Sequence, residues 1–161
     1  MEPRINLLAN ELGARIGKRF YNLNRAVEEG PLPKTTRELV NLRVSQINGC
    51  GFCVDIHTKE LAAAGEELVR INLVAAWRES TVYTDAERAA LELAEEGTRL
   101  ADTGHGVSDE TWAAARKHYD EDQMVALIGL IALMNASNRF NVIVRSRGGS
   151  YQPGAYAAMA E

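Results

Sequence analysis

The sequence predicts an all-α fold in a single domain, and three observations support this. Apolar residues recur at spacings of three and four along most of the chain. Several segments begin with the polar residues that cap helices. No segment shows the strict alternation and tight turns of β-hairpins. A chain of 161 residues suits one domain, so we expect a single domain over 1–161, with a helical core over about 30–147 and an irregular tail over 148–161.

The first predicted element is an amphipathic helix, or a broken pair of helices, from residue 3 to about residue 29. Pro3 suits a first helical turn because its missing N–H has no helical partner there. The turn Gly30-Pro31-Leu32-Pro33 ends this element. Its apolar positions are Ile5, Leu8, Leu12, Ile16, Phe20, Leu23 and Val27.

A second helix is predicted from Thr35, with Glu38 three residues later in the capping-box spacing. The pair Asn48-Gly49 is a plausible end for it. A third helix then runs from Cys50 through His57 to about residue 65, and a further helix covers residues 68–77.

Two more caps predict the helices that follow. Thr84 and Glu87 form a second capping box, which begins a helix that ends near residue 100. After a loop over residues 102–106, Ser108 caps a helix over residues 109–118.

The longest apolar helix is predicted from residue 120 to about residue 145. Its run VALIGLIALM has ten residues, about half of what is needed to cross a bilayer, so we expect a core segment and no membrane span. Asn135, Asn138 and Arg139 lie on this helix, where polar side chains require partners. Helix–helix hydrogen bonds or a subunit interface explain them better than catalysis.

The composition excludes some functional classes. A net charge of −4 with no basic stripe argues against nucleic-acid binding. The N-terminal stretch lacks the apolar core of a secretory signal, so we expect a cytoplasmic protein. In that compartment an isolated CxxC is redox-active or metal-binding more often than structural.

The chemistry is concentrated in the segment from Glu38 to His57. Cys50 and Cys53 are the two cysteines of the chain. At about 100° per helical residue, Cys53 lies roughly 60° and His57 roughly 20° from Cys50. Two thiols and an imidazole therefore share one helix face, which is the basic arrangement for a thiol activated by a neighbouring base.

Four interpretations of this CGFCVDIH motif compete. A structural zinc site needs four ligands, but His105 and His118 are in distant segments and there is no second CxxC. Covalent haem attachment requires a histidine directly after the second cysteine, where this chain has Val54. Two buried cysteines acting as small apolar residues are the third interpretation. A redox dithiol is the fourth, and the pattern favours it.

A redox dithiol has specific requirements that these residues meet. A thiolate cleaves a peroxide, and the start of a helix stabilises that anion. His57, four residues after Cys53, could accept its proton directly or through one water. The second thiol can then condense with the sulfenic acid to form a disulfide. Glu38 has two interpretations: the capping partner of Thr35, which spacing alone favours, or a carboxylate that orients His57.

The spacing of Glu38, Cys50, Cys53 and His57 resembles the E-x(11)-CxxC-x(3)-H signature of alkylhydroperoxidase D-like proteins in the carboxymuconolactone decarboxylase superfamily. The likeness covers nearly everything after about residue 30. It includes LVNLRVSQINGCGFCVDIHTKELAAAGE, AAWRESTVYTDAERAALELAE, MNASNRF and GGSYQPG. The resemblance implies an all-helical fold and a homo-oligomer, a trimer or a hexamer of dimers, with a helix-rich interface.

The resemblance also implies roles for the four residues. Cys53 would be the peroxidatic thiol and Cys50 the resolving thiol, with His57 and Glu38 as the proton relay. The best-characterised peroxidase branch has a histidine directly before the second cysteine, where this chain has Phe52. Because Phe52 cannot transfer protons, either the relay is shorter here or the activity is weaker.

The expected function is therefore a thiol-dependent peroxidase acting on alkyl hydroperoxides or hydrogen peroxide. It would use no metal, haem or flavin, and an external dithiol, lipoyl-carrying or thioredoxin-like, would recycle it. The alternatives are a protein thiol–disulfide oxidoreductase or redox sensor, a lactone decarboxylase like the enzymes that gave the superfamily its name, and a non-catalytic oligomeric scaffold.

Overall fold

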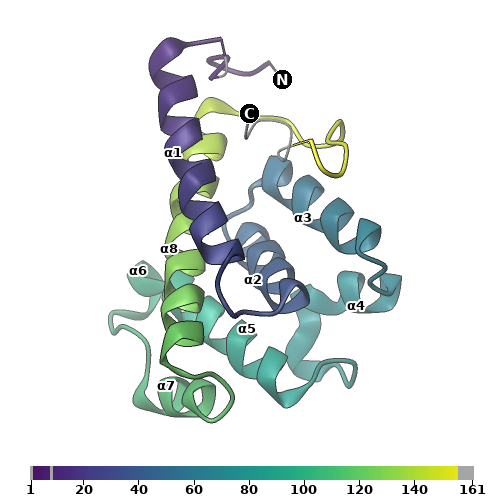
Figure 1. Cartoon of the computed structure of the whole chain (residues 1–161), viewed down its shortest axis with the longest axis vertical. Coiled ribbons are helices and arrows are strands. Elements are labelled where there is room, and N and C mark those ends of the chain that lie inside the picture. Colours follow the sequence, from purple (N-terminus) through teal and green to yellow (C-terminus); the bar gives the residue numbers. More distant parts are fainter. Residues whose placement is uncertain (1, 8, 156–161) are drawn as a thin grey trace.

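The computed structural model describes residues 2–7 and 9–155, and this part of the chain is all-helical, as predicted (Figure 1). Its elements are eight α-helices and one 3-10 helix, and the described residues contain no strand. The elements are α1 (Glu11–Glu28), α2 (Lys34–Ile47), α3 (Gly51–Ala63), α4 (Leu68–Leu73), η1 (Val74–Glu79), α5 (Asp85–Thr98), α6 (Leu100–Thr103), α7 (Asp109–Arg116) and α8 (Glu121–Val144).

Helix α2 is the centre of the molecule, because it packs against α3, α5 and α8. Its two sides face two different apolar clusters. Val40 and Val44 belong to the cluster formed with α5 and α8. Leu39 and Leu42 belong to the cluster formed with α3 and η1. The core is thus divided by the helix that carries Glu38.

The N-terminal helix begins later than predicted. It starts at Glu11 because the side chain of Asn10 accepts a hydrogen bond from the Gly13 amide at 2.9 Å. Pro3 therefore lies outside it. The preceding segment packs against the end of α8, where the Arg4 amide donates to the Val144 carbonyl at 2.8 Å.

The capping box predicted at Thr35 is wrong. Pro33 is the N-cap of α2, and no side chain caps this end. The Glu38 carboxylate instead bonds to a side chain of α3. The capping box at Thr84 and Glu87 is confirmed.

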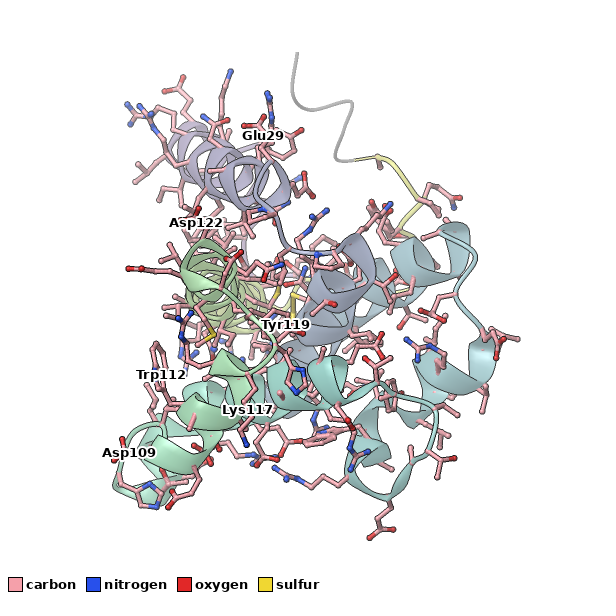
Figure 2. All side chains as sticks on the ribbon, turned by 60° about the horizontal axis from the view of Figure 1, so that its bottom comes forward. Glu29, Asp109, Trp112, Lys117, Tyr119 and Asp122 are labelled. Atoms are coloured by element: carbon pink, nitrogen blue, oxygen red, sulfur yellow. A yellow bond between two sulfur atoms is a disulfide. The ribbon has the colours of Figure 1, made fainter. Side chains whose placement is uncertain are left out.

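Helix α8 ends where predicted, with Arg145 in the left-handed conformation at its C-cap. Figure 2 shows this helix nearly end-on, with Tyr119 turned toward the interior and Trp112 at the periphery. In the described part of the chain, α8 is long and apolar enough to span a bilayer, and 39% of its most apolar window is buried in the molecule. Core helices of globular proteins satisfy the same criterion. Val125 and Ile128, within its predicted core run, are exposed.

The tail is irregular as far as the structure describes it, through residue 155, and the prediction for residues 156–161 falls outside the described residues. Residues 148–154 are part of the yellow segment beside α3 in Figure 1, and they contact this helix from Gly51 to Glu60.

Asn138 joins α8 to α2 through buried hydrogen bonds, which confirms the predicted helix–helix role. It accepts a hydrogen bond from the Asn48 amide at 2.9 Å and donates to the Ser45 hydroxyl at 3.2 Å. Replacing Asn138 with Ala removes both hydrogen bonds, including the one to the hydroxyl of the buried Ser45. We expect the free energy of unfolding, measured by urea titration, to fall by about 1–3 kcal/mol.

The matched control is Asn24→Ala, which removes an exposed hydrogen bond to Glu28. Its effect should stay within about 0.5 kcal/mol. Equal effects of the two substitutions would contradict the role given to Asn138.

Candidate active site

The cysteines are positioned by a tight turn between α2 and α3. Asn48 is the C-cap of α2, and Gly49 follows with a φ of +66°, a conformation that favours glycine. The Cys50 amide then donates to the Ser45 carbonyl at 3.0 Å. The chain thereby reverses, and Cys50 becomes the N-cap of α3.

Cys50 and Cys53 form a disulfide with Cα atoms 5.3 Å apart, so the predicted pair is close enough to bond. Both are buried, with exposed fractions of 1% and 3%. The Cys53 amide donates to the Cys50 Sγ at 3.3 Å. Because this N–H belongs to the first turn of α3, it favours negative charge on Cys50 once the disulfide opens.

Glu38 and His57 form the second pair of the site. Glu38 Oε2 and His57 Nδ1 are 2.7 Å apart and join α2 to α3, and both residues are buried. With Nδ1 donating to the carboxylate, Nε2 is the ring nitrogen with a lone pair for a proton. The four predicted residues therefore form two bonded pairs, and each pair has a member on α3.

A polar layer supports the turn that leads to Cys50. The Asn48 side-chain amide donates to Asn135 Oδ1 at 3.0 Å as well as to Asn138. Asn135 in turn donates to the Thr98 hydroxyl at 3.1 Å. The end of α2 is thus fixed to α8 and α5 by hydrogen bonds that few alternative packings would satisfy.

Asn41 is a residue of this region that the sequence reasoning missed. It lies three residues after Glu38 on α2 and is only 2% exposed, and its side-chain oxygen has no hydrogen-bond partner among the described residues. A buried acceptor of this kind fits a water or a substrate hydroxyl. Its one sequence signal was an asparagine on the same broad face as Glu38.

The two other histidines of the chain do not belong to the two pairs of the site. His105 and His118 are exposed. Within the described residues, no group of three or more His, Cys, Asp and Glu side chains could hold a metal ion. Trp77 is a core residue whose ring lies under the Arg78 guanidinium, and Arg78 pairs with Glu92.

Comparison with known proteins places the chain in a family. The model of the carboxymuconolactone decarboxylase family matches residues 15–96, which include all four site residues. The chain belongs to this family. The uncharacterized protein YdfG of Bacillus subtilis is 38% identical over 133 residues, which is 83% of this chain and 89% of YdfG.

Two further comparisons concern proteins named for peroxide chemistry. The crystal structure of a protein of unknown function from Agrobacterium tumefaciens, proposed as the antioxidant defence protein AhpD, has a TM-score of 0.85 and 35% identity. The match covers 93% of this chain and all of that one. The alkyl hydroperoxide reductase AhpD of Methylocella silvestris is 62% identical over only 34 residues, 21% of this chain and 19% of that protein. The AhpD-like fold of this family is thereby established.

The bond between Glu38 and His57 should be measurable as a coupling energy. Because each group is buried, Glu38→Ala or His57→Ala leaves its partner unsatisfied and should lower the free energy of unfolding by about 1–3 kcal/mol. In a double-mutant cycle at neutral pH, we expect a coupling of about 0.5–3 kcal/mol.

The exposed pair Arg25–Glu29 provides the control, with side chains 52% and 63% exposed. Its coupling should not exceed about 1 kcal/mol. A Glu38–His57 coupling no larger than that of the control would argue against a well-formed buried bond.

Proposed function

We propose that this protein is a thiol-dependent peroxidase that reduces alkyl hydroperoxides or hydrogen peroxide through Cys50 and Cys53. The observation that carries the proposal is the buried hydrogen bond of 2.7 Å between Glu38 and His57. His57 belongs to α3, the helix whose first turn holds the Cys50–Cys53 disulfide. This combination supplies a nucleophile, a resolving thiol and a route for protons. The named AhpD relatives support the same chemistry.

In the proposed cycle, the Cys53 thiolate attacks one oxygen of the peroxide and the O–O bond breaks. The leaving alkoxide takes a proton and becomes an alcohol, or water in the case of hydrogen peroxide. Cys53 is now a sulfenic acid. The Cys50 thiolate attacks that sulfur, water leaves and the disulfide forms. An external dithiol then reduces the disulfide by two successive exchanges.

His57 serves Cys53 in this scheme. It lies four residues later on α3, one turn along the same side of the helix. Its Nε2 takes the Cys53 proton, directly or through a water, and later returns it to the leaving oxygen. Glu38 holds the ring in the required tautomer and stabilises the imidazolium that forms.

Cys50 has a different activator. Its sulfur already accepts the Cys53 amide at 3.3 Å, and this helix-start N–H stabilises the thiolate that must attack the sulfenic acid. Each thiol thus has its own source of activation. Phe52, which is half-buried, contributes no proton transfer, so the proposed relay consists of His57 and Glu38 alone.

Burial of both sulfurs favours a small substrate over a protein substrate. With exposed fractions of 1% and 3%, Cys50 and Cys53 are accessible to a peroxide more readily than to a folded partner. This weighs against exchange with a partner protein as the main activity. The intact CxxC weighs against the lactone decarboxylase alternative, which uses no redox dithiol.

The reductant and the assembly belong to the same proposal. The expected electron donor is an external dithiol, lipoyl-carrying or thioredoxin-like. Because both cysteines are buried, the small lipoyl dithiol is favoured over a folded thioredoxin-like protein. A homo-oligomer is supported by exposed apolar side chains along α1 and α8, which are Leu12, Leu23, Val125, Ile128, Val142 and Ile143.

Substitution of each cysteine should have a different effect. Cys53→Ser removes the nucleophile, so peroxide consumption in the presence of dithiothreitol should fall to the rate of the reductant alone. Cys50→Ser leaves the nucleophile and should still consume one equivalent of peroxide per subunit without reductant. Turnover by Cys53→Ser at the wild-type rate would contradict the mechanism.

Substitution in the relay should slow catalysis while the disulfide can still form. General acid–base catalysis contributes about 10²–10⁴-fold, so Glu38→Gln and His57→Asn should lower kcat/KM for cumene hydroperoxide within that range. His118→Asn, at an exposed histidine just after α7, is the control and should retain wild-type activity. Loss of activity in all three variants would indicate a general effect on the protein.

A further inference from the structure

Residues 148–154, which we call the strap, lie on α3 and are held there by three charged side chains (Figure 1). Asp55 accepts hydrogen bonds from the amides of Gly149 at 2.6 Å and Tyr151 at 3.1 Å. Lys59 Nζ donates to the carbonyls of the same two residues, at 3.1 and 2.9 Å. These contacts recognise the backbone of the strap.

Glu60 fixes the far end of the strap. It accepts the Tyr151 hydroxyl at 2.5 Å and the Gly154 amide at 2.8 Å. Burial acts to raise the pKa of Glu60, but these two hydrogen bonds, together with the electrostatic effects of Lys34 and His57, lower it overall. The Lys59 ammonium, 2.7 Å away, and the strap amides likewise lower the pKa of Asp55. The carboxylates therefore stay charged near neutral pH and hold the strap.

The near end of the strap rests directly on the backbone of the dithiol turn. A Cβ atom on Gly148 would collide with the carbonyl group of Gly51, so only glycine fits there. Gly51 is the first residue of α3 and lies inside the ring that the Cys50–Cys53 disulfide closes. The conformation of this ring therefore determines whether Gly148 can pack against the Gly51 carbonyl group.

The strap contacts α3 at several positions around the helix. At about 100° per residue, Asp55 and Lys59 lie roughly 140° and 180° around α3 from Cys50, whereas Glu60 lies only about 20° from Cys53. The direct contact of the strap with the dithiol ring is the one between Gly148 and the backbone of Gly51.

We propose that the strap and the disulfide are thermodynamically coupled: the seated strap favours the disulfide form, and reduction of the pair loosens the strap. The contacts described above are those of the disulfide form, in which the closed ring fixes Gly51 under Gly148. Opening the ring frees Cys50 and its neighbours to move, and the strap then loses the packing contact between Gly148 and Gly51. Linkage requires the converse, that loss of the strap makes reduction easier.

This inference rests on the proposed function only in that the pair must cycle between dithiol and disulfide. The protein is equilibrated with glutathione and glutathione disulfide. Two glutathione thiols supply two electrons and two protons to the Cys50 and Cys53 sulfurs and become one disulfide. The dithiol fraction is then read by alkylation and mass spectrometry.

Gly148→Ala should displace the strap and make the disulfide easier to reduce. The ratio [GSH]²/[GSSG] at which half of the protein is reduced should then fall by about fivefold or more, the lower end of typical coupling between sites. Gly106→Ala is the matched control, because nothing lies within 4 Å of its added Cβ, and it should leave the midpoint unchanged. Asp55→Ala removes the acceptor of two strap amides and should shift the midpoint in the same direction.

The reciprocal effect is measured in the wild-type protein by trypsin. The side chain of Arg147 is 49% exposed, but the residues that follow it belong to the strap. The protease can bind these residues only when the strap leaves α3, so cleavage after Arg147 reports the release of the strap. Release of the C-terminal peptide should be about fivefold or more faster in the reduced than in the oxidised protein. Cleavage after the exposed Lys117 serves as the internal control and should not change.

The outcomes separate this inference from the proposed function. Unchanged midpoints in both Gly148→Ala and Asp55→Ala, in an enzyme that reduces peroxide, would overturn the coupling alone. Shifted midpoints in a protein that consumes no peroxide would support the coupling and contradict the proposed function. Equal trypsin rates in the two redox states would overturn the coupling in either case.

Discussion

The reversal of the chain at Asn48 and Gly49 is the constraint on which the rest of the site depends. The left-handed conformation of Gly49 lets α3 fold back along α2. Only then can Glu38 and His57, nineteen residues apart in the chain, meet at 2.7 Å. The same reversal makes Cys50 the N-cap of α3 and ties its amide to Ser45. One turn thus determines the position of both cysteines, the imidazole and the carboxylate.

Buried polar groups hold that turn in place and give the site its chemical character. Asn48, Asn135, Asn138 and Ser45 form a hydrogen-bonded layer between α2 and α8. Away from water, such bonds are stronger, and a missing partner costs more. The strap binds α3 through Asp55, Lys59 and Glu60. The dithiol turn is therefore supported by the polar layer at the end of α2 and by the strap on α3.

The sequence predicted those features that depend on local pattern. Cysteine spacing, the Asn48-Gly49 stop and the capping box at Thr84 rest on contacts within a few residues, and the structure has them where expected. The local sequence pattern failed to predict the contacts of residues whose partners are far away in the chain. Glu38 has the spacing of a cap for Thr35, but its carboxylate bonds to His57 on another helix. The late start of α1 is different, because it depends on a local cap at Asn10 that the apolar spacing did not reveal. The strap was predicted only as irregular, because its partners on α3 lie about 90 residues away in the chain.

The central claim is that Cys53 reacts with the peroxide, with Cys50 as the thiol that resolves the product. Its most direct test is to treat reduced Cys50→Ser protein with one equivalent of cumene hydroperoxide, trap sulfenic acid with dimedone and map the adduct by mass spectrometry. The account predicts one adduct per subunit, at Cys53, together with one equivalent of alcohol. Consumption of the peroxide without an adduct at Cys53, or no consumption at all, would contradict it.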